Sequence, residues 1–419
     1  MAKKLFTKNA GRLLWPTRIE GREKMFNSVR LELTGRCDMK CLYCHAGEKN
    51  TSYYNQDELP HSRWLEVIKE CKSMGVKNFI LTGGEPFLYR RWSELVDACG
   101  SDARVVISTN GKHFSEANLA VLSELPQVKE FRTSIDGLAT NDIIREGSSY
   151  TESLESIRRL GLVFPDRKVM VQTVIYQQNL PEIPLLYQAL KDIGIYCWRL
   201  SQLWKTIRTE RNRNILDFSD YEKMFGFFAE VIRMHQCDSK PFLLRIDNVY
   251  YSWIEKEDYS PMDLCGHPCS YNFNFLCVNA NGDLIFCPAL NVPFASIKNQ
   301  SVKDAIEGSA WLKDFKDITV QSVGCHGCRY IKICGGGCRA DALRWFGTIT
   351  KIDPNSCCMM PRIEAKILPL LGDEERKAFE ALIDQNGLFP AIAGSNIEQA
   401  VSSFNKKGGS GDDAQEQTA

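Results

Sequence analysis

The chain has 419 residues, of which 44% are hydrophobic, 25% are charged and 10% are aromatic. Its 52 basic residues balance 52 acidic ones, a composition that excludes wholesale disorder, fibrous repeats and a nucleic-acid binder working mainly through phosphate contacts. No apolar run approaches the roughly 18 residues that span a bilayer and the start lacks a signal-peptide stretch, so we expect a cytoplasmic protein of two or three domains without membrane contact.

From residue 29 to about 203, short β-rich runs alternate with amphipathic helical stretches. The expected strands are 29–34, 78–82, 104–108, 129–135, 168–175 and 196–202, and the expected helices lie near 61–74, 90–99, 115–124, 151–161 and 181–192. Because parallel neighbours need a crossover that is usually helical, this alternation predicts an α/β fold with a parallel sheet, either doubly wound or barrel-like. In both architectures the functional residues belong at the carboxyl ends of the strands.

The flanking segments differ from this domain in composition. Residues 1–28 form a basic arm, and residues 204–262 are charged and predict a helical linker in which 218–234 is the clearest helix. Residues 263–360 are rich in cysteine and turns, with a hairpin signal at 279–283 between two apolar runs. Residues 361–405 predict C-terminal helices, and 406–419 a flexible polar tail.

Cysteine is unusually frequent, with 17 residues in a chain that shows no route to an oxidising compartment. In a reducing cytosol, clustered thiols indicate metal binding or catalysis, whereas scattered thiols behave as small buried apolar groups. We expect five separated cysteines to serve packing: Cys71, Cys99, Cys197, Cys237 and Cys277. The others gather at 37–44, 265–287, 325–338 and 357–358.

The first cluster is Cys37-x3-Cys41-x2-Cys44, directly after the first expected strand. Iron–sulfur clusters are held by cysteine thiolates, and three protein thiolates leave one iron of a [4Fe–4S] cube open to another ligand. The alternative is a zinc ion held by the three thiolates and His45.

At these residues the chain resembles the radical S-adenosylmethionine (SAM) enzymes. Their signature is Cys-x3-Cys-x2-Cys after the first strand of a partial (β/α)6 barrel, with an aromatic residue, here Tyr43, before the third cysteine. The resemblance continues at Gly83-Gly84-Glu85-Pro86 after the second strand, the family's motif for the SAM amino group. Glycines allow close approach, and Glu85 offers an anionic acceptor to the ammonium.

The resemblance also implies SAM contacts from polar residues that follow later strands, namely Ser108, Asn110, Ser134, Asp136 and Arg145. For Asn110 and Asp136 the alternative is turn formation, because Asn-Gly and Asp-Gly are preferred turn dipeptides. For Arg145 the alternative is a position on the surface.

The second constellation is Cys325-x2-Cys328-x5-Cys334-x3-Cys338, followed by Cys357 and Cys358 and preceded by Cys269-x12-Gly282-x4-Cys287. It resembles the SPASM extension of radical SAM enzymes, which carries two auxiliary [4Fe–4S] clusters. The alternative, a double zinc ribbon, fits less well because only the pair 325–328 has the usual Cys-x2-Cys spacing.

The SPASM resemblance implies an interleaved set of ligands. One cluster takes Cys325, Cys328, Cys334 and a late cysteine, Cys357 or Cys358. The other takes Cys287 and Cys338 with one or two cysteines before the hairpin, of which Cys265 and Cys269 are better candidates than Cys277. Sulfatase-maturing members place an aspartate directly after the hairpin cysteine, and Pro288 at that position disfavours their activity.

The resemblance therefore implies a partial (β/α)6 barrel with a C-terminal cysteine-rich iron–sulfur domain and terminal helices. Its cofactors are three [4Fe–4S] clusters and SAM, and an electron donor such as flavodoxin or ferredoxin starts the reductive cleavage of SAM to a 5′-deoxyadenosyl radical. The radical takes a hydrogen atom from the substrate, and auxiliary clusters suit a net oxidation because they accept an electron. No substrate base is identified, since Asp283, Tyr271 and Tyr330 have structural roles as alternatives.

For the substrate, we favour oxidative modification or crosslinking of a ribosomally made peptide. Some 28 residues precede the first strand, too few for a leader-binding domain. This weakens the peptide hypothesis without removing it, since a separate leader-binding protein could serve instead. The alternatives are dehydrogenation, epimerisation or rearrangement of a small molecule derived from a sugar or an amino acid, and a non-enzymatic iron–sulfur or zinc protein.

Overall fold

The computed structural model describes residues 26–44, 58–202, 221–247, 267–269 and 275–389. The chain divides into two compact units: the first comprises Met1–Leu216, Glu230–Tyr251 and Ser270–Asp317, and the second Asp217–Ala229, Ser252–Cys269 and Ile318–Ala419. The C-terminal tail, residues 406–419, and most of the basic arm lie outside the described residues. Three residues considered for the site, His45, Cys265 and Tyr271, lie outside them as well.

The first unit is built on one sheet with the strand order β10-β9-β8-β1-β2-β3-β4-β5-β6-β7. Every neighbouring pair from β8 through β7 is parallel, whereas β9 is antiparallel to both β8 and β10. The strands are β1 (Ser28–Glu32), β2 (Asn78–Thr82), β3 (Arg104–Ser108), β4 (Val128–Ser134), β5 (Lys168–Ile175), β6 (Cys197–Gln202), β7 (Leu243–Ile246), β8 (Phe275–Val278), β9 (Asp283–Ile285) and β10 (Pro293–Ser296).

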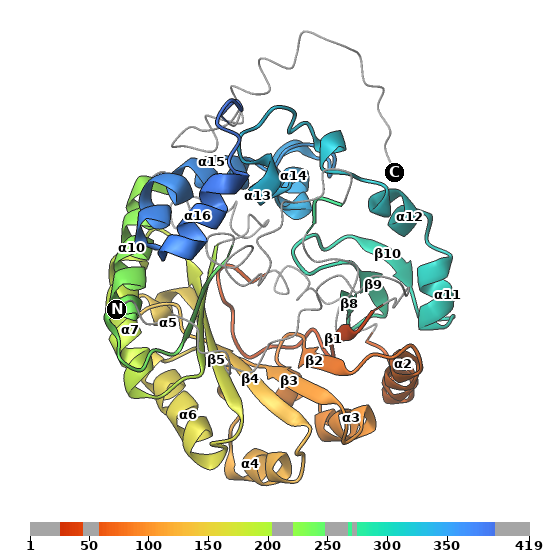
Figure 1. Ribbon diagram of the computed structural model, residues 1–419. Coiled ribbons are helices and arrows are strands. Elements are labelled where there is room, and N and C mark those ends of the chain that lie inside the picture. Colours follow the sequence, from red (N-terminus) through yellow and green to blue (C-terminus); the bar gives the residue numbers. More distant parts are fainter. Residues whose placement is uncertain (1–25, 45–57, 203–220, 248–266, 270–274, 390–419) are drawn as a thin grey trace. The chain divides into compact units, whose positions relative to one another are not determined.

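Helices connect the parallel strands and cover one side of the sheet. Those of the first unit are α2 (His61–Ser73), α3 (Trp92–Cys99), α4 (Glu116–Ser123), α5 (Asn141–Ile144), α6 (Tyr150–Val163), α7 (Ile183–Asp192), α11 (Val302–Glu307) and α12 (Ala310–Lys316). Figure 1 shows α2, α3, α4, α6 and α7 on the outer, convex side of the sheet. Along α2 the buried side chains Trp64, Val67, Ile68 and Cys71 repeat at helical spacing and form one apolar stripe toward the strands.

The second unit is helical in its described part. It contains α13 (Ile331–Cys334), α14 (Arg339–Phe346), α15 (Pro354–Arg362) and α16 (Asp373–Leu382), with a π-helical turn at Ile363–Ile367 after α15. Helix α10 (Tyr221–Cys237) contributes to both units. Short 3₁₀ segments lie at Pro86–Leu88, Leu180–Glu182, Gln321–Val323 and Leu368–Leu370.

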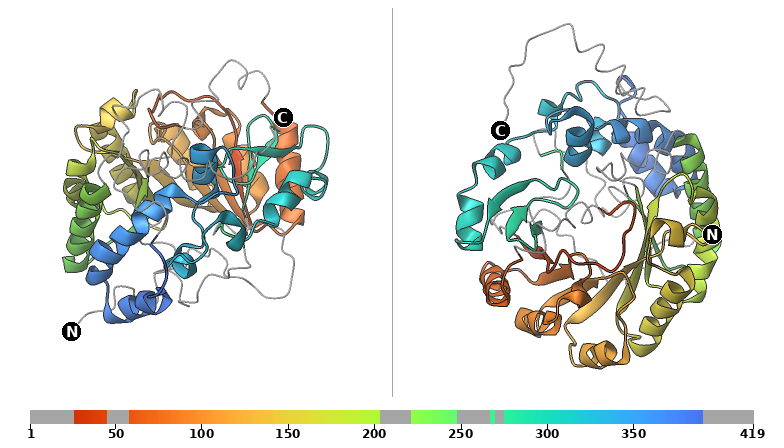
Figure 2. Two further views of the ribbon diagram at one scale, coloured as in Figure 1. Left: turned by 90° about the horizontal axis from the view of Figure 1, so that it is seen from above. Right: turned by 180° about the vertical axis from the view of Figure 1, so that it is seen from behind.

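The expected α/β fold with a parallel, barrel-like sheet and a cysteine-rich C-terminal region is confirmed. The sheet is wider than expected, because β7 joins β6 and the predicted hairpin β8–β9 extends the opposite edge. Strand β8 pairs in parallel with β1, so that Cys277 is opposite Arg30, and Figure 2 shows these strands side by side. Cys277 is fully buried in an apolar cluster with Ile80, Val106, Phe275 and Ile285, the packing environment expected for it.

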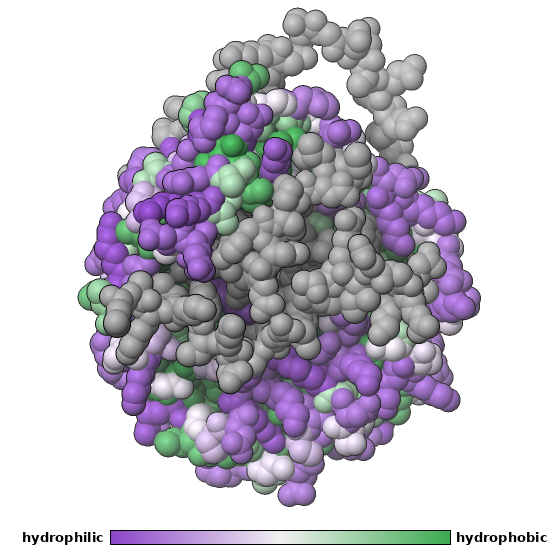
Figure 3. Space-filling view, viewed as in Figure 1, coloured by the Kyte–Doolittle hydropathy of each residue, from purple (hydrophilic) through white to green (hydrophobic). Residues whose placement is uncertain are grey.

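The surface of the described residues is mostly polar on the face that Figure 3 shows. Within the part of the chain that the structure describes, no helix combines the length and the apolar character needed to cross a bilayer.

Candidate functional site

The loop after β1 brings three thiols to the carboxyl end of the sheet. Its backbone is held at two points, because Lys40 donates to the carbonyl of Glu146 and Leu42 to that of Ile144, each across 2.9 Å. The pKa of Cys37 is raised to about 11 and that of Cys41 to about 12, mainly by burial and to a smaller extent by the nearby Cys44. The three thiols are therefore close enough to interact electrostatically.

The donor set in this loop fits an iron–sulfur cube with one open iron. The Cys37 sulfur accepts a hydrogen bond from the Met39 backbone, a contact of the kind that stabilises thiolate ligands of such clusters. A buried thiolate without a cation is costly, and iron would supply the missing positive charge. Among the described residues, no three Cys, His, Asp or Glu side chains are arranged to hold a single metal ion.

The glycines after β2 pack directly on the cysteine loop. Gly84 donates to the carbonyl of Thr34 and Glu85 to that of Arg36, across 2.7 and 2.8 Å. A Cβ on Gly84 would lie 2.1 Å from the Arg36 carbonyl oxygen, and one on Gly83 would lie 2.5 Å from that of Thr34. The glycines are needed for close approach, as expected. In this structure, the group that approaches them closely is the backbone of the cysteine loop.

Glu85 is completely buried and binds the loop that follows β3. Its carboxylate accepts hydrogen bonds from the Thr109 hydroxyl, the Asn110 amide and the Phe87 amide, across 2.8, 2.7 and 3.2 Å. Burial raises its pKa to about 7, against the opposing effect of these hydrogen bonds. The acid predicted to meet an ammonium group thus also joins the second and third strands, and Pro86 starts the short 3₁₀ segment behind it.

Tyr43, Asp136 and Arg145 form one hydrogen-bonded network at the end of β4, in which Asp136 and Arg145 are buried and Tyr43 is half-buried. The Tyr43 hydroxyl donates to Oδ2 of Asp136, and Nη1 of Arg145 lies 3.1 Å from that hydroxyl and 3.5 Å from the same carboxylate oxygen. The backbone amide of Val174 donates to Oδ1 of Asp136 across 2.7 Å. Burial raises the pKa of Asp136.

Arg145 is therefore not a surface residue; it is 3% exposed. Its Nη2 contacts the sulfur of Met39 at 3.9 Å, while its Nε is buried without a hydrogen-bond partner. Cys41 interacts electrostatically with the same guanidinium. A buried cation with an unpaired donor beside the thiol loop fits a carboxylate ligand such as that of SAM.

Asp38 is a further polar residue of the cysteine loop, and the sequence patterns do not assign it to the site. Asp38 accepts a hydrogen bond from Nδ2 of Asn110 across 2.7 Å, and its other oxygen lies 3.3 Å from both Nζ of Lys112 and Nε2 of His113. Burial acts to raise the pKa of Asp38, but these three side chains outweigh it and lower the pKa. Asn110 therefore anchors the loop rather than only forming a turn, and the only sequence signal for Asp38 is its place inside the Cys-x3-Cys spacing.

Ser108 and Ser134 are the last residues of β3 and β4, and both are half-buried. The first unit therefore gathers every predicted residue of the cofactor site at the carboxyl ends of β1 to β4.

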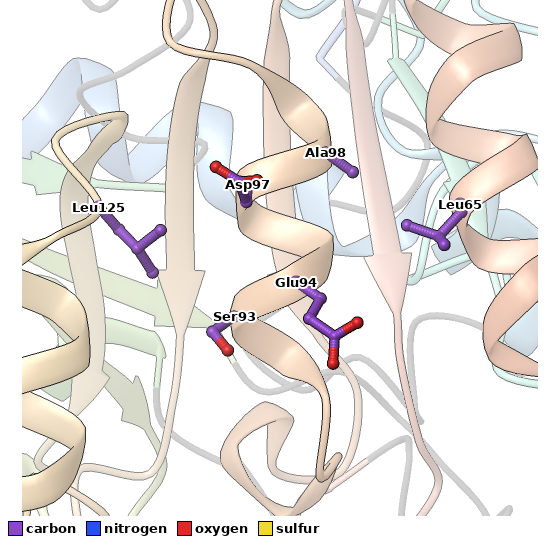
Figure 4. Close-up of a pocket in the computed structure, with 6 residues that line it drawn as sticks. All are labelled: Leu65, Ser93, Glu94, Asp97, Ala98 and Leu125. Carbon is purple, nitrogen blue, oxygen red and sulfur yellow. The ribbon is translucent and has the colours of Figure 1, made fainter.

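Figure 4 shows a surface pocket of about 460 Å³ elsewhere in this unit, lined by Leu65, Ser93, Glu94, Asp97, Ala98 and Leu125. It lies between outer helices and has no thiol in its lining, so it is separate from this site.

The second unit gathers four thiols of the C-terminal constellation. The pKa of Cys357 is raised far above its ordinary value, mainly by burial and further by Cys334, Cys325 and Cys328. Burial likewise raises the pKa of Cys325 to about 11 and that of Cys334 to about 12. The backbone of Tyr330 donates to the Cys328 sulfur and that of Gly336 to the Cys334 sulfur.

The two adjacent cysteines of α15 differ in their surroundings. Cys358 is fully buried, and the charged groups that affect its pKa are Arg362 and Asp353 rather than other cysteines. Cys357 is the one of the pair that lies among the other thiols. The arrangement fits Cys357 as the fourth ligand.

The remaining predicted ligands are divided between the two units. Cys287 follows β9 in the first unit, where its buried sulfur accepts the backbone amide of Leu290 across 3.2 Å. Cys338 and Cys269 belong to the second unit, and the Cys269 amide donates to Nδ1 of His267 across 3.0 Å.

Comparison with known proteins agrees with the geometry of the first unit. Residues 31–190 match the family model of the radical SAM superfamily. This part of the chain is therefore a radical SAM domain, an enzyme domain that binds SAM and a [4Fe–4S] cluster.

Two curated relatives align over most of the chain. The AdoMet-dependent heme synthase of Methanosarcina barkeri is 26% identical over 352 residues, which cover 79% of this chain and 97% of that protein. The PqqA peptide cyclase of Xanthomonas euvesicatoria is 23% identical over 387 residues, covering 87% of this chain and 96% of the relative.

A solved structure shares the fold. Streptococcus suis SuiB bound to S-adenosylmethionine superposes with a TM-score of 0.63 at 17% identity, covering 79% of this chain and 77% of SuiB. The same protein bound to its precursor peptide SuiA gives a TM-score of 0.60 at 16% identity.

Proposed function

We propose that the protein is a radical SAM enzyme of the SPASM type that oxidatively modifies or crosslinks a ribosomally made peptide. The observation that carries the SPASM part is the gathering of Cys325, Cys328, Cys334 and Cys357 in the second unit. Support for a peptide substrate comes from the PqqA peptide cyclase, with which the chain aligns over 96% of that protein's length, and from the shared fold with SuiB, which has been solved with a precursor peptide.

In this proposal the protein carries three [4Fe–4S] clusters. Cys37, Cys41 and Cys44 hold the first. Cys325, Cys328, Cys334 and Cys357 hold the second, and Cys287 and Cys338 hold the third together with Cys269 and Cys265. When bound, the first cluster and SAM supply a one-electron cleavage that leads to abstraction of a substrate hydrogen atom.

The chain's own residues bind and orient SAM. Glu85, which is anionic above its pKa of about 7, attracts the ammonium, and the unpaired Nε of Arg145 is a donor for the carboxylate. Tyr43 and Asp136 hold that guanidinium in place. Ser108, Asn110 and Ser134 supply polar groups at the neighbouring strand ends, and Gly83, Gly84 and Pro86 set the backbone of the Glu85 loop.

The test is anaerobic reconstitution followed by chemical analysis. We expect about twelve irons per chain for three cubes and formation of 5′-deoxyadenosine when SAM and a strong reductant, or flavodoxin or ferredoxin, are added. A Cys41→Ser variant serves as control, because it removes one ligand of the first cluster and leaves the second unit unchanged. About four irons in the wild type would contradict the SPASM assignment, and zinc without 5′-deoxyadenosine would favour a non-enzymatic metal protein.

A second candidate is modification of a small molecule. The AdoMet-dependent heme synthase, whose name refers to a small-molecule product, aligns with this chain over 97% of its own length. Dehydrogenation, epimerisation or rearrangement of such a molecule, or of one derived from a sugar or an amino acid, uses the same cofactors. Mass spectrometry after incubation with candidate peptides, with and without a separate leader-binding protein, and with candidate metabolites distinguishes the two: a peptide that loses two hydrogens supports the first.

A further inference from the structure

Asp353 is a buried carboxylate in the second unit, which carries the C-terminal cysteines. It is 2% exposed and precedes α15, the helix that carries Cys357. Its Oδ1 accepts the backbone amide of Asn355 across 2.9 Å, and its backbone carbonyl accepts the amide of Cys357 across 3.1 Å. These bonds fix the first turn of α15, because an Asp at the N-terminus of a helix satisfies amides that have no partner within the helix.

The second oxygen of the same carboxylate binds a different segment. Oδ2 of Asp353 accepts the backbone amide of Cys338 across 2.8 Å and the hydroxyl of Ser356 across 2.5 Å. Asp353 therefore connects the segment that carries Cys357 with the segment that carries Cys338, through hydrogen bonds to a charged acceptor, which are stronger than those between neutral groups.

The turn that leads to Cys338 is shaped around this carboxylate. It consists of Gly335, Gly336 and Gly337, all with positive φ, between 60° and 89°. A Cβ on Gly337 would lie 2.5 Å from Oδ2 of Asp353 and 2.7 Å from the Ser356 hydroxyl. The buried guanidinium of Arg339 donates to the carbonyl of Gly336 within this turn and to that of Lys351 outside it.

We propose that Asp353 is a positioning residue that holds the ligand segments of two auxiliary clusters in one fixed arrangement. The inference rests on the proposed function, in which Cys357 and Cys338 ligate different clusters. The two cysteines are far apart in the sequence, and hydrogen bonds to the single residue Asp353 join their segments. Loss of that side chain therefore affects both clusters of the cysteine-rich region, while the radical SAM cluster keeps its own loop.

The experiment compares Asp353→Asn with Asp341→Asn after anaerobic reconstitution. Asn retains the shape but offers one oxygen acceptor in place of two, so it cannot hold both segments. Asp341 is a matched control, because it is also buried, at 4% exposure, and pairs with Arg344 at 3.2 Å. For Asp353→Asn we expect a loss of about four to eight of about twelve irons and a weaker auxiliary EPR signal, with 5′-deoxyadenosine formation retained; for Asp341→Asn we expect the full iron content.

A second pair of variants acts from the glycine side and does not change the carboxylate. Gly337→Ala places a methyl group against Asp353, whereas Gly347→Ala adds the same group at a similar φ, 71° against 74°, where no atom lies within 4 Å. We expect iron loss in the first and not in the second, with circular dichroism showing that both are folded.

The outcomes separate the two proposals. A wild type with about twelve irons and full iron in both Asp353→Asn and Gly337→Ala overturns the role of Asp353 alone. A wild type with about four irons overturns the auxiliary clusters themselves, and the role of Asp353 with them. Equal iron loss in Asp353→Asn and Asp341→Asn also overturns the proposal, because it shows a general effect of buried charge.

Discussion

The Tyr43 hydroxyl donates a hydrogen bond of 2.5 Å to Oδ2 of Asp136. This contact joins the residue before Cys44 to the loop that follows β4, 93 positions along the chain. Asp136 and Arg145 are both buried, so Tyr43 attaches the cysteine loop to the sheet through a buried, hydrogen-bonded charge pair. Such a pair is sensitive to the loss of one member, because the remaining charge stays buried without compensation.

Substitutions in this network should destabilise the protein in a defined order. Tyr43→Phe removes one hydrogen bond to a charged group and should lower the free energy of unfolding by about 1.5–3 kcal/mol. Asp136→Ala leaves the Arg145 guanidinium without its carboxylate and should cost about 3–5 kcal/mol. Urea unfolding measures both. Tyr89→Phe is the control: its hydroxyl lies 3.2 Å from Nδ1 of His61 in a half-buried site, and we expect less than about 1.5 kcal/mol. An equal effect of all three substitutions would show that the buried charges do not matter.

Gly84 should tolerate no side chain. In Gly84→Ala the methyl group meets the Arg36 carbonyl oxygen at 2.1 Å, and the cysteine loop must move to relieve the clash. We expect a loss of about 1–3 kcal/mol in unfolding free energy together with about four irons after reconstitution. Gly161→Ala is the matched control in α6, since no atom lies within 4 Å of its added Cβ, and it should stabilise the helix by up to about 1 kcal/mol. Full iron content in Gly84→Ala would contradict this explanation of the motif.

The sequence predicts the β/α units well because their signals are local. The bounds of β2, β3 and β5 agree with the expected strands residue for residue, since each is a short β-rich run that ends at a change to turn-forming or polar residues. The hairpin is also recognised from its turn residues. By contrast, the pairing of β8 with β1 and the presence of β7 depend on contacts between distant segments, and no local pattern states which sheet edge a strand will join.

The same division holds for the site. The spacing of the cysteines identifies the thiol clusters from the sequence alone. The residues that hold the cysteine loops in place cannot be identified in this way. Asp38 is hydrogen-bonded to Asn110, 72 positions away in the sequence, and Asp353 to Cys338, 15 positions away. An isolated aspartate belongs to no periodic pattern from which such a contact could be predicted. The choice between Cys357 and Cys358 is of this kind too, because adjacent residues on a helix point about 100° apart and only the fold shows which one faces the other thiols.

Acidification should destabilise the first unit through His235. Burial among Tyr187 and Phe242 lowers the pKa of this imidazole to about 4, whereas the unfolded chain has a value near 6.5. Its Nδ1 lies 3.5 Å from the Tyr187 hydroxyl, which also contacts the carboxylate of Asp238. Because the unfolded state binds the proton more readily, this contribution to stability is complete above about pH 6.5 and is lost progressively as the pH falls toward 4.

Between pH 7.5 and 5.5 the unfolding free energy should fall by about 1 kcal/mol more in the wild type than in His235→Phe. The variant keeps an aromatic ring at this position and cannot titrate, while the Tyr187 hydroxyl retains Asp238 as an acceptor and Asp238 retains Lys191. Chemical unfolding at the two pH values measures the difference, and the carboxylates common to both proteins cancel. Parallel pH dependence in the two proteins would mean that the imidazole is accessible to protons in the folded state.

Substitution by alanine should lower the iron content at Cys357 but not at Cys358. Cys357→Ala removes a thiol that lies among Cys334, Cys325 and Cys328, so we expect the loss of about four of twelve irons after reconstitution. Cys358→Ala removes a buried sulfur whose charged neighbours are Arg362 and Asp353, and it should retain the full iron content with a modest loss of stability. The adjacent positions share one helix turn, so a general effect of the helix appears in both variants and a ligand effect in one. Iron loss in Cys358→Ala alone would move the fourth ligand to that residue, and full iron content in both variants would leave the cluster with three protein thiolates.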